Sequence, residues 1–369
     1  MAAAVDDDDD DERAPDPPPS RLKSLLRKIW WLHSTVALAF GGVAMLFARA
    51  GLAHADKVMI ALLVSWLLLF VALRFIVGPS NRRDDEGFAR KGIRVATNYI
   101  IKQFYQQMFF FLVPIYASSA TWSFASRNWW LAPLLLLCGV LSTIDLVFDH
   151  YVMERRHLAA AMYGIAMFAL LNVLMPLVAE CDHFAGLIIA AAATPASVAL
   201  LSFSVKSVLS PQGAILTLAM TGGLLFAVWA GREVIPPAPL AMPETAVGHG
   251  TLGSYECLPS SAHQLRADEL DGLRCGSLLR EPGGLKEPIE HVWFHAGSEV
   301  ARVSPERVSC DGDALVYRST FPPDKLPAKP EGTWTCETFT QNGQLVGSRA
   351  FVVLPPSDQV HSDQIRSAK

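Results

Sequence analysis

Seven apolar segments constrain the fold of this chain more than any other feature of its sequence. A helix needs about 20 mostly apolar residues to cross the hydrocarbon core of a bilayer. Segments that approach or reach that length lie at 29–48, 58–77, 104–121, 129–148, 158–178, 184–204 and 213–231. Only 18% of the residues are charged, against roughly 25% in ordinary soluble domains, and the mean hydropathy is +0.29. The sequence therefore predicts a membrane all-α helical bundle of about seven transmembrane helices in residues 21–231, embedded in the lipid bilayer.

The distribution of Lys and Arg between these segments predicts the orientation of the chain, because cytoplasmic loops carry an excess of both residues. Fourteen of them lie in the N-terminal tail and in the second, fourth and sixth connections, whereas the other three connections hold only Arg49, Lys57 and Arg127. With seven spans, this alternation puts the N-terminus in the cytoplasm and the C-terminus outside. Residues 53–55, "AHA", also resemble a signal-peptide cleavage site, and cleavage there would leave six spans and the same outside C-terminus.

Both ends of the chain are expected to be disordered. Residues 1–20 contain the acidic run Asp6–Glu12 and have almost nothing apolar to bury. A solvated tail is the expected role of that run, and binding of a basic partner is the alternative. Residues 356–369 form the second expected tail.

Beyond residue 231 the composition changes to that of a soluble β domain. Residues 232–249 are Pro-rich and predict a semi-rigid linker. Residues 250–355 then show short alternating segments separated by turn signals, at "HVWFH", "EVARV", "ALVYRST", "GTWTCETFT" and "SRAFVVL". This pattern predicts a small antiparallel β-sandwich, and a segment of this length is enough for one such core.

Four of the six cysteines lie in this domain, at Cys257, Cys275, Cys310 and Cys336. An even number of cysteines outside the cytoplasm favours disulfides. Of the three possible connectivities, we expect Cys257–Cys275 together with Cys310–Cys336. Strand alternation puts Trp334 and Cys336 on one face, so the Trp is expected beside a buried bridge. The alternative, a zinc site, is disfavoured because the four cysteines contain no C-x-x-C pair.

The C-terminal part resembles a known family. The stretch "LKEPIEHVWFHAGSEVARV", followed by "EGTWTCETFTQNGQLVGSRAFVV", resembles the domain of unknown function 2914 of bacterial envelope proteins over about 285–353. The apolar part at 25–232 looks like the N-terminal portion of the domain of unknown function 5924, on its architecture alone. The resemblance implies an immunoglobulin-like sandwich in the periplasm, an inner-membrane location and no established activity. The chain departs from the pattern at Cys310 and Cys336, and its aromatic cluster is reduced to Tyr317.

The first candidate site is a hairpin that carries His291, Trp293 and His295 on one strand face. We take these three residues as the candidate partner surface. Trp293 is suited to stacking on a sugar ring, whereas a Trp in a sandwich strand is more often core. The two histidines lie roughly 13 Å apart along the strand, too far to share one metal ion, so no metal site is expected.

The second candidate site lies inside the apolar segments. Asp145 and Asp149 are four residues apart on the fourth segment, hence on one helix face, and His150 follows them. Lys102 and Gln106 form a polar stripe at the start of the third segment. Polar residues at such positions are costly, and they mark either a structural ion pair or a path for ions or protons.

The outer domain contains no nucleophile motif and no recognisable pair of catalytic carboxylates. We therefore expect a non-enzymatic protein without a cofactor, and no binding to nucleic acid. Its sandwich would contact a periplasmic protein or a glycan of the cell envelope. The alternative is a transporter or an ion- or proton-conducting protein that uses the intramembrane cluster, and a membrane-embedded enzyme for lipid-linked substrates is a third hypothesis.

Overall fold

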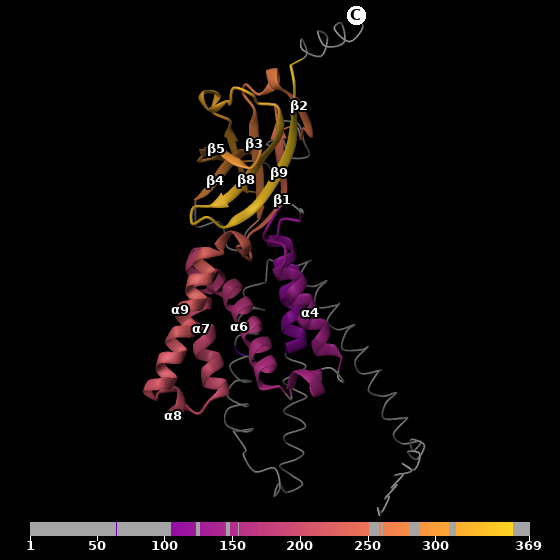
Figure 1. Ribbon diagram of the computed structural model, residues 1–369. Helices are drawn as coiled ribbons and strands as arrows, with labels where there is room; N and C mark the ends of the chain where they lie inside the picture. Colours follow the sequence, from indigo (N-terminus) through magenta and orange to yellow (C-terminus); the bar gives the residue numbers. More distant parts are fainter. Residues whose placement is uncertain are drawn as a thin grey trace, which may run out of the picture.

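The chain folds into a helical part followed by a β-sandwich, and the sandwich stands on one end of the helices (Figure 1). The computed structural model describes residue 64 and the ranges 105–122, 126–144, 148–153, 155–250, 258–259, 261–280, 288–309 and 315–356. Apart from residue 64, the predicted spans 29–48 and 58–77 lie outside the described residues, as do the tail 1–20 and residues 357–369.

The described helical part supplies three helices that are long and apolar enough to cross a membrane: His157–Val178, His183–Ser202 and Pro211–Ala230. They belong to α6 (Arg156–Val178), α7 (His183–Ser202) and α9 (Pro211–Ala230). The other helical elements are a helix at 105–119, α4 (Leu131–Thr143), the π-helical η3 (Phe148–Met153), the short α8 (Val205–Val208) and the 3₁₀ turn η4 (Arg232–Val234).

The predicted count of seven spans is not supported within the described ranges. Two of the seven predicted segments lie outside those ranges, apart from the single residue 64. The predicted segment 129–148 is also longer than its helix, because α4 has 13 residues and Ile144 is already extended. What the structure supports is the coarser prediction of an apolar helical part followed by a β domain.

Local sequence signals explain where α7 and α9 begin. The carboxylate of Asp182 accepts a hydrogen bond from the Ala185 N–H at 2.6 Å, which caps the start of α7. The hydroxyl of Ser210 accepts from the Gly213 N–H at 3.2 Å at the start of α9. Pro211 follows as the first helical residue, where its missing N–H costs nothing.

The helices α6 and α7 pack closely where a glycine faces a proline. A Cβ added to Gly186 would come within 2.8 Å of Cδ of Pro176, so only glycine allows this approach. Farther along the same pair, the hydroxyls of Tyr163 and Ser197 are 2.6 Å apart and both residues are buried. The two contacts explain how two helices that each contain a proline still pack along their length.

Nine strands in the described residues form the two sheets of the sandwich. The first sheet has the order β1 (Ala241–Gly248), β3 (Arg274–Arg280), β7 (Leu315–Thr320), β6 (Glu306–Ser309). The second has the order β2 (Gln264–Arg266), β9 (Leu345–Leu354), β8 (Gly332–Thr340), β4 (Ile289–His295), β5 (Ser298–Val303). All neighbouring strands are antiparallel except β2 and β9, which run parallel. The 3₁₀ turns η5 (Ala267–Glu269) and η6 (Pro323–Lys325) complete the domain.

Two tryptophans fill the space between the sheets. Trp293 of β4 and Trp334 of β8 are 0% and 1% exposed, respectively. Phe321 packs edge-on against both rings, at centroid distances of 5.3 Å and 5.5 Å, and Phe351 packs at 6.4 Å and 6.2 Å. Such aromatic pairs supply much of the burial that holds a small sandwich together.

The disulfide of this core joins Cys275 of β3 to Cys336 of β8, and so links the two sheets. The expected pairs Cys257–Cys275 and Cys310–Cys336 are therefore wrong. The partner of each cysteine is decided by which strands face each other across the core, and these two strands are 61 residues apart. The other two cysteines of this domain, Cys257 and Cys310, lie outside the described residues. The prediction that Trp334 lies beside a buried bridge is confirmed.

The predicted linker 232–249 needs a second correction, because most of its C-terminal half is strand β1. Its residues pair with β3 from Ala241 to Gly248, with an irregularity near the start. Proline is tolerated there because β1 is the outer strand of its sheet. The predicted hairpin turn, in contrast, is present: Ala296 and Gly297 connect β4 to β5 with φ values of 50° and 81°.

Candidate functional site

A buried asparagine connects the sandwich to the helical part by hydrogen bonds. Asn128 lies in the loop between the helix 105–119 and α4, and it is 0% exposed. Its Nδ2 donates to the carbonyl of Leu345, at the start of β9, at 2.8 Å. Its Oδ1 accepts from the backbone N–H of Thr121 and from the hydroxyl of Ser126, both at 2.9 Å. Each of these groups would be costly to bury unpaired, so Asn128 ties the loop and the sandwich together.

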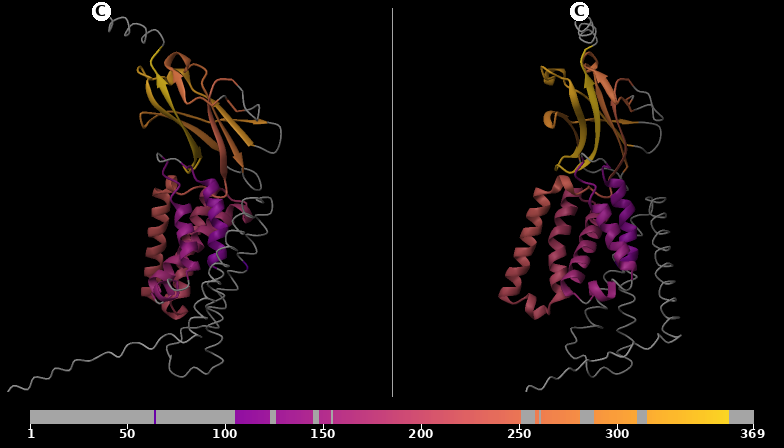
Figure 2. Two further views of the ribbon diagram at one scale, coloured as in Figure 1. Left: turned by 90° about the vertical axis from the view of Figure 1, so that its right-hand side faces the viewer. Right: turned by 45° about the vertical axis from the view of Figure 1, so that its right-hand side comes forward.

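Further hydrogen bonds surround this contact, which we call the junction (residues 121, 126–130, 232–235 and 344–346). They run from Thr121 Oγ1 to the Val346 carbonyl (3.3 Å), from Trp130 Nε1 to the Val234 carbonyl (2.9 Å) and from Gln344 Nε2 to the Ile235 carbonyl (3.5 Å). The two views of Figure 2 show the sandwich on the same end of the helices. These hydrogen bonds therefore hold the sandwich against the helices, in addition to the chain connection between them.

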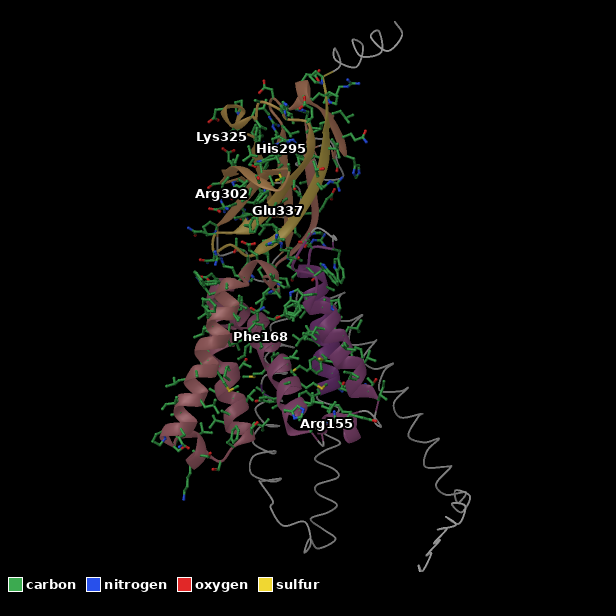
Figure 3. All side chains as sticks on the ribbon, in the orientation of Figure 1. Arg155, Phe168, His295, Arg302, Lys325 and Glu337 are labelled. Carbon is green, nitrogen blue, oxygen red and sulfur yellow. A yellow bond between two sulfur atoms is a disulfide. The ribbon has the colours of Figure 1, made fainter. Side chains whose placement is uncertain are left out.

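Charged side chains gather beside the junction. Glu337 of β8 lies on the sandwich above the helices (Figure 3) and is half-buried. Burial is the largest effect on its carboxyl and raises the pKa, and the charge of Glu233 raises it further. Arg127 and a hydrogen bond with Ser348 act in the opposite direction. The result is a carboxyl that gives up its proton less readily than an exposed glutamate.

A second polar cluster lies between the two sheets and is centred on His291. The ring is 0% exposed, with Nε2 at 3.1 Å from the hydroxyl of Ser277 and Nδ1 at 2.7 Å from that of Ser319. Ser277 also lies 2.7 Å from the hydroxyl of Thr338. Burial lowers the pKa of His291 to about 4, because a charged ring is poorly solvated there. His291 is therefore a neutral part of the core at neutral pH.

These positions overturn the predicted partner surface. His291 and Trp293 are both 0% exposed, since the strand face that they share is the one turned toward the opposite sheet. His295, the third residue, is partly buried at the end of the strand. Its ring lies 4.8 Å from that of Trp334, and its Nε2 is 3.0 Å from the carbonyl of Glu331. The alternation of the hairpin was read correctly, but it marks the core.

The same region brings together the ligand-type atoms of Cys275, His291 and Cys336, which all lie within 4.8 Å of one another. Both sulfurs are bonded to each other in the disulfide. A thiolate is the form of cysteine that holds a metal, so only the imidazole of His291 remains as a donor. That ring already contacts hydroxyls at both nitrogens. The three residues therefore stabilise the contact between the two sheets and do not form a metal site.

The predicted intramembrane cluster is described only in part. Lys102 and Asp145 lie outside the described residues, and of Asp149 and His150 only the backbone, in η3, is described. Gln106 is 2% exposed, and within the described ranges neither its Oε1 nor its Nε2 has a hydrogen-bond partner. Such an amide is costly inside a helical bundle.

Other polar residues of the described bundle pair with each other. Asn172 Nδ2 donates to the hydroxyl of Tyr116 at 2.9 Å, and that hydroxyl donates to the Ala169 carbonyl at 3.0 Å. These bonds tie the helix 105–119 to α6. Gln106 lies about three turns away from Tyr116 on the same helix, and a purely structural role leaves its unpaired amide unexplained.

Sequence reasoning missed two residues that the fold makes important, Asn128 and Arg349. Asn128 sits in "SRNWW", and its partner Leu345 is 217 residues away, so no local pattern signals the contact. Arg349 lies in the alternating segment "SRAFVVL", and alternation alone does not show which side of a strand faces the core. Its face becomes known only from the register of β8 and β9, which pairs it with Cys336.

These features define a class: a protein whose apolar helices, three of them long and apolar enough to cross a membrane, carry a disulfide-containing β-sandwich on one end. Within this class, the chain belongs to a family of unknown function (DUF5924), whose model matches residues 18–273. The match crosses the junction and ends just before β3, so the family includes the first strands of the sandwich as well as the helices. No curated protein matches the chain, and no solved structure does.

Proposed function

We propose that this chain is a bacterial inner-membrane protein that presents its sandwich in the periplasm as a binding module for a protein or glycan of the cell envelope. In this proposal seven spans anchor it, the N-terminus is cytoplasmic and the sandwich is immunoglobulin-like. It carries out no reaction of its own.

Three observations support the location. Lys and Arg alternate between the connections as a cytoplasmic N-terminus requires. The described disulfide between Cys275 and Cys336 is of a kind that persists outside the reducing cytoplasm. Residues 285–353 also resemble the domain of unknown function 2914 of bacterial envelope proteins, and the family match at 18–273 stops before that region.

The observation that carries the proposal is the hydrogen bond by which Asn128 fixes the sandwich to the helical part. A domain held by a buried side chain that makes three hydrogen bonds keeps one orientation relative to the helices. Its far end then always faces the same partner. That end carries exposed apolar side chains, Leu326 at 42%, Val352 at 39% and Leu354 at 38%, which replace the hairpin as the candidate contact residues.

The proposal is tested by photo-crosslinking in living cells. A photoreactive residue is placed at Leu326 or Val352 on the sandwich, and at Leu218 on α9, which is 70% exposed and apolar, as a matched control. A binding module gives a defined adduct with an envelope protein or glycan from the two sandwich positions, and lipid adducts alone from α9. Adducts that are the same at all three positions would contradict the proposal.

One observation favours a second candidate, a transporter or an ion- or proton-conducting protein. The buried amide of Gln106 has no hydrogen-bond partner among the described residues, and polar groups inside a membrane bundle can mark a path for ions or protons. The test replaces Gln106 with Leu and measures proton and cation flux into proteoliposomes. Lost flux with normal protein levels supports conduction, whereas higher stability with no flux in either protein leaves Gln106 without a conducting role.

A further inference from the structure

Arg349 points into the sandwich. Its register partner across β8 and β9 is Cys336, and directly opposed residues of an antiparallel pair lie on the same face. Because Cys336 forms the disulfide to the opposite sheet, that shared face is the inner one. The Nε of Arg349 is accordingly buried, and no described residue forms a hydrogen bond with it.

Within the described residues, no carboxylate balances the positive charge of Arg349. Its hydrogen bonds there go to neutral acceptors, through Nη2 alone. Arg302 of β5 shows the ordinary arrangement in the same domain. Its guanidinium bonds Glu290 at 2.6 Å and Glu299 at 3.0 Å. An arginine that faces inward without an acid has donors and charge to offer to a ligand.

Two further side chains meet the guanidinium. Nη2 of Arg349 donates to the hydroxyl oxygen of Ser261 at 2.6 Å and lies 3.2 Å from Nε2 of His263. Because a guanidinium only donates, the ring nitrogen accepts, and the Ser261 hydroxyl keeps its own hydrogen for another acceptor. Both residues are exposed, so the site opens to solvent.

The backbone holds these side chains in place. The N–H of Ala262 donates to the carbonyl of Val247 in β1 at 2.8 Å. The carbonyl of His263 accepts from an N–H of β9 at 3.0 Å. The segment 261–263 therefore bridges the two sheets at the edge where β1 meets β9, directly beside Arg349. A site built on strands and a pinned segment is already organised for binding.

We propose that Arg349, Ser261 and His263 form a binding site for a phosphate-type oxyanion at this edge of the sandwich. The ligand's oxygens would accept from the free guanidinium N–H groups and the Ser261 hydroxyl, and its charge would balance that of Arg349. Free phosphate and the phosphodiester of a lipid headgroup share this chemistry. The site stands independently of the envelope partner proposed above.

The test uses the full-length protein in a detergent without phosphate. Inorganic phosphate, and then short-chain phosphatidylglycerol below its micelle concentration, are titrated by calorimetry at constant ionic strength. We expect saturable binding that falls roughly ten- to hundredfold in Arg349→Met, the loss of charge-assisted hydrogen bonds. Binding of both probes identifies a headgroup site, and binding of phosphate alone identifies a site for a free anion.

Two controls keep the result interpretable. Arg302→Met removes an equal charge from the same domain and is expected to leave binding unchanged. Ser261→Ala changes an exposed residue and is expected to weaken binding severalfold while the protein stays folded, which covers the case in which Arg349→Met does not fold. Absence of saturable binding, or equal losses in Arg349→Met and Arg302→Met, would overturn the proposal. Neither result would affect the crosslinking test of the binding module.

Discussion

Replacing Asn128 with Ala is the sharpest perturbation of the junction. The substitution leaves three protein groups without their partner: the Leu345 carbonyl, the Thr121 N–H and the Ser126 hydroxyl. Each such group costs about 1–3 kcal/mol when it stays buried and unpaired. Exposed residues flank Asn128 on both sides, so water can reach part of the gap. We expect the junction to lose about 2–4 kcal/mol of stability.

Hydrogen exchange of the full-length protein measures this loss directly. Backbone amides in the turn between β8 and β9 open with the junction, and a loss of about 2 kcal/mol accelerates their exchange roughly thirtyfold. Asn172→Ala is the matched control, because it also removes a buried asparagine amide, but one that bonds Tyr116 inside the helical part. That variant is expected to leave exchange in the turn unchanged.

Two results would refute the reasoning. Unchanged exchange in the turn of Asn128→Ala would mean that the sandwich does not depend on this contact. Equal acceleration in both asparagine variants would mean that any loss of bundle stability frees the sandwich, and the specific role of Asn128 would be lost.

Three further predictions concern the sandwich. The pKa of His291 is lowered from 6.5 to about 4, so the unfolded chain takes up a proton first as the pH falls, and roughly 3 kcal/mol of stability is lost between these values. Unfolding at several pH values is expected to show this loss in the wild type and not in His291→Gln. Trp334→Phe is expected to cost about 1 kcal/mol more than Trp293→Phe, since the Trp334 N–H donates to a backbone carbonyl at 2.7 Å and the Trp293 N–H has no acceptor among the described residues. Equal losses in denaturant unfolding would contradict this. Replacing Cys275 and Cys336 with Ala is expected to cost about 4 kcal/mol, the chain-entropy value for a loop of this length, and a change below 1 kcal/mol in thermal unfolding would speak against it.

The sequence predicts those parts of the fold that depend on local patterns. Alternation located the hairpin, and "AGS" located its turn, where Gly297 adopts a positive φ. The same alternation placed Trp334 and Cys336 on one buried face. Long apolar runs located α6, α7 and α9 within a few residues. Each of these features depends on residues that are close together in the sequence.

The features that sequence reasoning missed depend on contacts between distant segments. Cys275 bonds Cys336 because β3 and β8 face each other across the core. Strand β1 was hidden by prolines that an outer strand tolerates. Trp293 was open to both interpretations, core and ligand platform, with core the more common, because a strand pattern shows that two residues share a face and not which way the face points. The contact of Asn128 crosses 217 residues.

The proposed function places the sandwich outside the cell, and labelling of single introduced cysteines tests this location. Lys325 is exposed at the far end of the sandwich (Figure 3), and Lys206 is exposed in α8, at the opposite end of the helices (Figure 1). Each is changed to Cys in a chain whose Cys138, Cys181, Cys257 and Cys310 are replaced by Ser, so that only the disulfide pair remains beside it. Whole cells are treated with a membrane-impermeant maleimide, with the parent chain as background. We predict that Lys325→Cys is labelled in intact cells and Lys206→Cys only after the inner membrane is permeabilised. The reverse pattern would place the sandwich in the cytoplasm and contradict the account.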